Sequence, residues 1–86
     1  MLLTVEQISI YKKYGGDDDG FSRVATSREK SVMTGVSWAR VSELVQLLFG
    51  VQRGTVTAAF AQQIMSDVRA SCADQAAVDA LSQLAQ

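Results

Sequence analysis

The chain contains no proline, and apolar residues recur at helical spacing along almost its whole length. Proline breaks helices more strongly than any other residue, so long segments of this chain have nothing to interrupt a helix. No segment alternates apolar and polar residues between turn signals, as a half-buried strand would. We therefore expect an all-α fold.

Residues that cap helices divide the chain into segments. Gln7 follows Thr4 at the spacing of a capping box, and Gly15 is placed to end the first helix. A second capping-box spacing, Thr26 with Glu29, predicts that a helix after Phe21 stops and restarts near Ser27. The expected N-caps of the four main helices are Thr4, Ser37, Thr55 or Thr57, and Asp74. The prediction is a small orthogonal bundle of four main helices plus one or two short helices, forming a single helical domain over residues 1–86.

The segment 38–49 has the widest apolar surface in the chain. More than half of its helix circumference is covered by Trp38, Val41, Leu44, Val45, Leu47, Leu48 and Phe49. A stripe this wide is typical of a helix with neighbours on several sides, so we expect this helix at the centre of the core. Narrower inward stripes are expected in the segments before and after it: Phe21, Val24, Ala25 and Val32, and then Phe60, Ala61, Ile64, Met65, Val68 and Cys72.

The residue inventory excludes several classes of chemistry. There is no histidine and only one cysteine, so a tetrahedral zinc site and the Ser-His and Cys-His catalytic systems are excluded. Nothing in the spacing of the carboxylates selects a catalytic pair. We expect no enzyme activity and no cofactor, and no small-molecule substrate is evident. Cys72 is expected to pack as a small apolar residue.

Net charge, hydropathy and cysteine content limit the partners and the compartment that can be expected. The formal net charge is −1, which gives no electrostatic footprint for nucleic acid or an anionic membrane. No apolar run is long enough for a membrane span, and the N-terminus lacks the basic region of a signal peptide. A single cysteine excludes an internal disulfide framework. The expected compartment is the cytoplasm.

The run Asp17-Asp18-Asp19-Gly20 has two interpretations. Aspartates at the start of a helix accept free backbone N–H groups and complement the dipole. Together with Arg23, the three aspartates also form a possible interaction edge for a basic partner. A calcium loop is the alternative, but aligning Gly20 with the central glycine of an EF-hand leaves the first carboxylate and the final glutamate missing.

The segment Glu43 to Thr57 resembles a helix-turn-helix of the repressor type. In that motif a glycine lies in the turn, an apolar residue follows it, and a buried valine comes after a polar stretch; Gly50, Val51 and Val56 occupy these places. The resemblance implies that the motif spans residues 42–61. It also implies nucleic-acid contacts by Gln52, Arg53 and Thr57, of which only Arg53 is a strong reader of base or phosphate. The other cations are scattered in the sequence. A DNA-binding protein, in contrast, concentrates its cations on one side of the molecule.

The leading hypothesis is a small all-helical protein-interaction module of unassigned biological role, without a catalytic constellation. Its expected partner is another protein or a second copy in a homodimer. The alternative is a helix-turn-helix DNA-binding protein that uses residues 42–61.

Overall fold

In the computed structural model, all 86 residues are described, and they form six helices and no strand. The helices are α1 (Val5–Lys13), α2 (Asp18–Val24), α3 (Ser27–Val32), α4 (Trp38–Arg53), α5 (Ala58–Ser71) and α6 (Gln75–Leu84). The all-α prediction of four main helices and two short ones is confirmed. None of these helices is both long enough and apolar enough to cross a membrane.

Helix starts follow the predicted capping residues. Thr4 Oγ1 accepts a hydrogen bond from Gln7 N at 3.2 Å, while Gln7 Oε1 accepts one from Thr4 N at 3.1 Å. Thr26 and Glu29 form the same reciprocal pair, which separates α3 from α2 as the sequence indicated. Each reciprocal pair satisfies two backbone N–H groups that have no partner within the helix.

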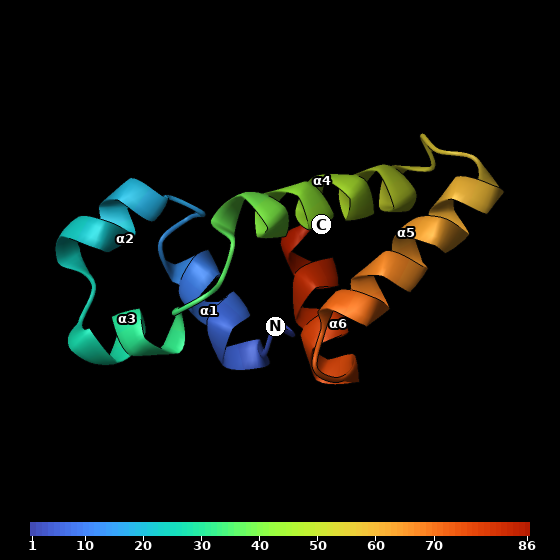
Figure 1. The fold of residues 1–86 in the computed structure, drawn as a ribbon. Coiled ribbons are helices and arrows are strands. Elements are labelled where there is room, and N and C mark those ends of the chain that lie inside the picture. The colour runs from blue at the N-terminus through green and yellow to red at the C-terminus, as the bar shows by residue number, and fades with distance from the viewer.

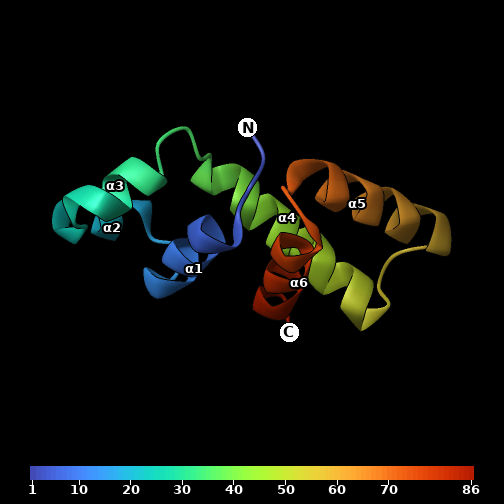
Figure 2. The ribbon, with the colours of Figure 1, turned by 90° about the horizontal axis from the view of Figure 1, so that it is seen from below.

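The molecule is elongated, with extents of 42 × 21 × 16 Å, because it contains two hydrophobic clusters side by side. Helix α4 runs along the long direction of the molecule, from its middle to the α4–α5 connection, and α6 crosses it (Figures 1 and 2). The larger cluster lies where α1, α4, α5 and α6 meet. The largest of its fully buried side chains are Leu44, Leu48, Ile64, Leu81, Val41 and Val68. As predicted, α4 supplies buried residues to the core, and Trp38 extends it into the smaller cluster. The central position is shared, however, because α6 contacts α1, α4 and α5.

The smaller cluster joins α2 and α3 to the start of α4. Its buried residues are Ile10, Phe21, Met33 and Trp38. The ring centroids of Phe21 and Trp38 lie 4.9 Å apart, within the range of aromatic contact. Val24 was predicted to point inward but is 71% exposed. This prediction was wrong because Ile10 and Met33, which the expected stripe did not include, fill the space against Phe21.

A backbone pairing connects the first residues to the α5–α6 junction. Leu3 N donates to Ser71 O at 2.9 Å, and Ala73 N donates to Leu3 O at 2.8 Å. The Leu3 side chain is buried in the larger cluster, next to the pairing. Cys72 is buried in the same cluster, as predicted, and its burial raises the pKa of the thiol.

Candidate functional site

The turn between α4 and α5 begins later than the helix-turn-helix pattern predicts. Helix α4 continues through Gly50 to Arg53, and Gly54 takes the left-handed conformation at φ 69°. Gly54 N donates to Val51 O at 3.2 Å and Thr55 N donates to Gly50 O at 3.0 Å, which is a Schellman motif. The assignment of Gly50 to the turn is therefore wrong.

Gly50 has a different role in this connection. A Cβ atom at this position would lie 3.4 Å from both Thr55 Oγ1 and Val56 Cγ1. Thr55 and Val56, in the connection to α5, therefore lie next to Gly50 of α4. At 3.4 Å these would be ordinary van der Waals contacts, and Gly50 has no left-handed backbone, so the structure shows no strict requirement for glycine at this position.

The three residues proposed to contact nucleic acid all lie around this turn, but none lies within α5. Gln52, in the last turn of α4, donates from Nε2 to Ser82 O at 2.8 Å and so ties α4 to α6. Arg53 lies with Cζ 4.5 Å from the centre of the Phe49 ring. Thr57 is the N-cap of α5 and accepts from Phe60 N at 3.2 Å. Each side chain thus has a structural contact of its own.

The surface around the turn exposes two large aromatic residues. Phe49, in the last turns of α4, is 41% exposed, and Phe60, in the first turn of α5, is 48% exposed. Both belong to apolar stripes that the periodicity predicted to face inward. Helices α5 and α6 pack on the side of α4 that carries Leu44 and Leu48, which leaves Phe49 at the margin of the core. We refer to residues 49–63 as the α4–α5 end.

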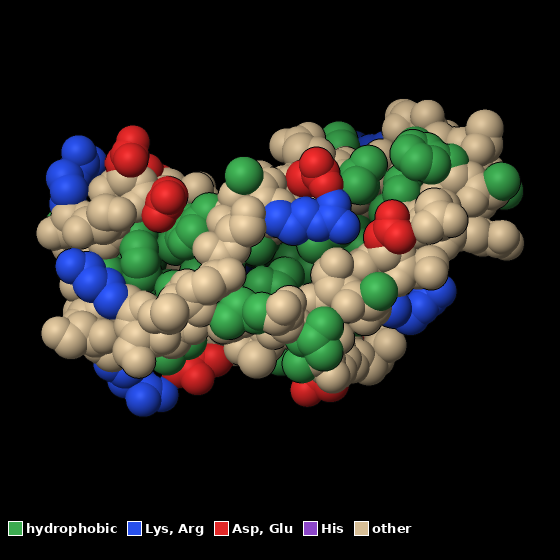
Figure 3. All heavy atoms as spheres, viewed as in Figure 1, with side chains coloured by type: hydrophobic (Ala, Val, Ile, Leu, Met, Phe, Trp, Pro, Cys, Tyr) green, Lys and Arg blue, Asp and Glu red, His purple; other side chains and the backbone are tan.

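The α4–α5 end is also nearly free of charge. From residue 44 to residue 66 the only charged side chain is Arg53, although charged residues make up 20% of the whole chain. At the tip of this end, the face drawn in Figure 3 shows only hydrophobic and uncharged side chains, whereas basic and acidic side chains are interspersed elsewhere. An aromatic surface that lacks charge but retains an arginine has the composition typical of protein–protein interfaces.

The predicted acidic edge is exposed, but its members do not form a cluster of ion pairs. Asp17 Oδ1 accepts from Gly20 N at 3.0 Å as the N-cap of α2. Asp18 and Asp19 lie in the first turn of α2 and Arg23 in the last, and no salt bridge joins them. Gly20 is helical. No three acidic or cysteine side chains converge to hold a metal ion, so the calcium alternative gains no support.

A polar cluster centred on Glu29 was not predicted. Its carboxylate accepts from Lys13 Nζ and from Tyr14 Oη, both at 2.7 Å, and from Thr26 N at 3.0 Å. These bonds, led by the one from Lys13, lower the pKa of Glu29 to about 2. The sequence identified the capping role of Glu29, but the contacts from α1 arise only when α1 and α3 pack together. The cluster fixes α3 against α1.

We predict that Glu29→Gln destabilises the protein in a pH-dependent manner. The pKa of Glu29 lies below its ordinary value of 4.5 in the folded state, so its carboxylate contributes stability that is fully present above pH 4.5. This contribution is lost as pH falls toward 2. Urea denaturation of wild type and variant should therefore show a larger difference in midpoint at pH 6 than at pH 3. A difference that stays constant over this range would contradict the prediction.

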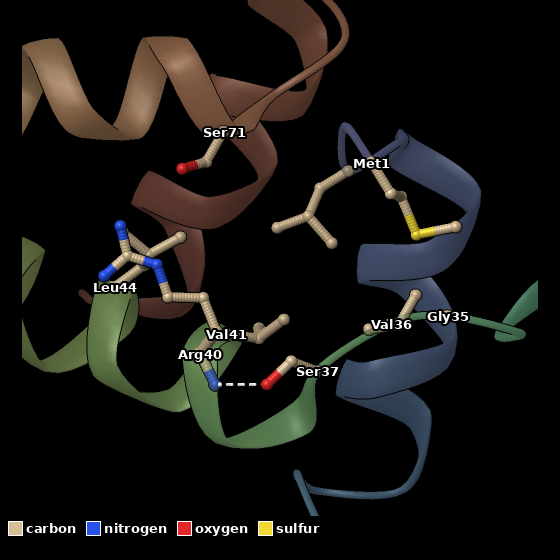
Figure 4. Close-up of a pocket in the computed structure, with 9 residues that line it drawn as sticks. Met1, Gly35, Val36, Ser37, Arg40, Val41, Leu44 and Ser71 are labelled. Carbon is tan, nitrogen blue, oxygen red and sulfur yellow. Dashed lines mark hydrogen bonds between the residues drawn. The ribbon is translucent and has the colours of Figure 1, made fainter.

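The larger of two surface pockets lies between the first residues, the α3–α4 connection and the start of α4 (Figure 4). Its volume is about 240 Å³, below the range of roughly 300–1,000 Å³ typical of ligand pockets. Its polar groups already have partners: Ser37 Oγ accepts from Arg40 N at 3.2 Å, and Arg40 pairs with Glu43. No convergent set of titratable groups lines the pocket.

Comparison of the chain with protein-family models, with curated proteins and with solved structures finds no match.

Proposed function

We propose that this chain is a protein-interaction module that binds its partner through the α4–α5 end. The observation that carries the proposal is the partial exposure of Phe49 and Phe60 at the α4–α5 end, where Arg53, stacked on Phe49, is the only charged residue. Aromatic residues and arginine are enriched among the residues that dominate binding energy at interfaces. The proposed role involves no catalysis, and the proposed compartment remains the cytoplasm, on the basis of the single unpaired cysteine.

The exposed area sets the scale of the interaction. Burying a whole phenylalanine side chain is worth about 1.5–3 kcal/mol, so covering the exposed part of each ring would contribute about 1 kcal/mol. Two such rings alone would support a weak complex, and neighbouring apolar atoms of the α4–α5 end would add to it. This scale fits a transient interaction better than an obligate one.

The test is a double substitution at the two exposed rings. We expect Phe49→Ser/Phe60→Ser to retain the helical circular dichroism spectrum and to lose at least tenfold in partner recovered by affinity capture from the native host. The control is Val24→Ser, which alters a 71% exposed apolar residue at the other end of the molecule and should capture the partner normally. Equal capture by wild type and the folded double variant would contradict the proposal.

Two other contact modes remain proposals. A second copy of the chain is a possible partner, and sedimentation velocity over a range of concentrations tests for a homodimer. The exposed edge formed by Asp17, Asp18, Asp19 and Arg23 is a separate candidate for binding a basic partner. The only observation that supports this edge is the exposure of its four side chains. Asp17 already accepts a hydrogen bond as the N-cap of α2.

DNA binding through α4 and α5 is the alternative function. Two consecutive helices joined by a short turn, with Arg53 at the turn, support it. The charge pattern does not, because no other cation lies between residues 44 and 66. We predict that titration with duplex DNA at two salt concentrations shows no steep loss of affinity with salt. A steep salt slope that Arg53→Ala reduces would favour the alternative, since phosphate contacts release counterions.

A further inference from the structure

We infer that the partner of the α4–α5 end is an amphipathic helical segment that carries carboxylates beside its apolar side chains. This inference builds on the proposed function and specifies the chemistry of the occupant. It depends on the stacking of Arg53 on Phe49 without a salt bridge, on the lack of aspartate and glutamate in residues 44–66, and on the all-helical fold.

Arg53 is held in place but has no ionic partner. The three salt bridges of the protein use Lys13, Arg28 and Arg40, and none includes Arg53. Its guanidinium lies over the Phe49 ring at 4.5 Å. Stacking on an aromatic face orients the planar group and leaves its N–H edge free to donate two parallel hydrogen bonds to a carboxylate.

The charge around Arg53 favours an acidic partner over a second copy of the chain. In a two-fold symmetric dimer the same patch contributes from both sides, so each copy would bring another Arg53. The α4–α5 end carries no aspartate or glutamate to compensate for these cations. A separate partner with carboxylates satisfies Arg53 and covers the exposed rings at the same time. The N-terminus of α5, the positive end of its dipole, lies at the same turn and adds to the preference for negative charge.

The fold indicates the form of the partner. The structure contains no strand, so it has no sheet edge to which an extended peptide could add. The exposed apolar side chains at this end lie on two helices. A third helix that packs its apolar side chains against these two helices would extend the helix-on-helix packing from which the rest of the molecule is built.

The experiment uses two synthetic peptides of about 25 residues, well above the length of roughly 12–15 residues below which isolated helices are marginal in water. They share leucines at helical spacing in an alanine-rich background, and they differ only at a few positions beside the leucines, which carry glutamate in one peptide and lysine in the other. Fluorescence anisotropy of each labelled peptide is measured against the full chain at low salt, where surface charge is least screened. We expect the glutamate peptide to bind wild type at least tenfold more tightly than the lysine peptide.

Charge reversal supplies the decisive comparison. Arg53→Glu leaves the core untouched and should reverse the preference toward the lysine peptide. Arg69→Glu is the matched control, because Arg69 is likewise exposed and forms no salt bridge but lies at the opposite end of α5. This control should keep the wild-type preference.

The outcomes separate this inference from the proposed function. Equal binding of both peptides, lost in Phe49→Ser/Phe60→Ser, would overturn the acidic partner and leave the interaction surface in place. Binding of neither peptide would also overturn it, while the capture experiment independently decides the proposed function. Self-association of wild type that the double variant abolishes would identify a second copy as the occupant and overturn the inference.

Discussion

Truncating Leu48 to alanine is expected to lower the free energy of unfolding by about 2–5 kcal/mol, the cost of a cavity in a packed core. Leu48 is 1% exposed and belongs to the cluster where α4 meets α5 and α6. A protein of this size has on the order of 5–10 kcal/mol of stability at most, so the change would leave a substantial unfolded population.

The effect of Leu48→Ala can be measured by urea denaturation followed by far-ultraviolet circular dichroism. Leu48→Met is the control, because it nearly preserves volume and should cost less than about 1.5 kcal/mol. A loss below 1 kcal/mol for the alanine variant would mean that the side chain is not central to the core.

Replacing Trp38 with alanine is expected to cost about 3–5 kcal/mol, the range for large aromatic truncations. Trp38 is 9% exposed, and its ring centroid lies 4.9 Å from that of Phe21 and 5.4 Å from that of Tyr11. Its removal would leave the smaller cluster without its largest side chain, so the packing of α2 and α3 would be lost first.

Circular dichroism is again the appropriate probe, because Trp38 is the only tryptophan and the variant lacks its fluorescence. Trp38→Phe should retain most of the stability by keeping an aromatic ring against Phe21. Wild-type melts followed by tryptophan fluorescence and by circular dichroism should coincide, since Tyr11 packs against both clusters and couples them. An alanine variant as stable as wild type would show that the smaller cluster contributes little.

The helix boundaries were predictable because capping chemistry is local. Thr4, Ser37, Thr57 and Asp74 each accept a backbone N–H three residues further on, as their sequence contexts indicated. Tertiary packing then brings together four aromatic residues from different segments: Tyr11, Tyr14, Phe21 and Trp38.

The candidate site was less predictable because it depends on where packing stops. Periodicity assigned Phe49 and Phe60 to inward stripes, but it carries no information on how far a neighbouring helix extends. Gly50 misled for a related reason. The presence of a glycine does not by itself distinguish a left-handed turn from an ordinary helical position, and the Schellman motif at Gly54 determined where α4 ends. The convergence of Lys13 and Tyr14 on Glu29 likewise requires tertiary contacts.

The pairing of Leu3 with the α5–α6 junction has a consequence for the order of events during folding. It joins positions 69 residues apart, and closing a loop of that length costs about 4 kcal/mol in chain entropy. Burial of one leucine and two backbone hydrogen bonds contribute about 4 kcal/mol in return. The pairing therefore cannot nucleate folding. It forms only after the helices have brought both ends of the loop together, and its presence marks completion of the native state.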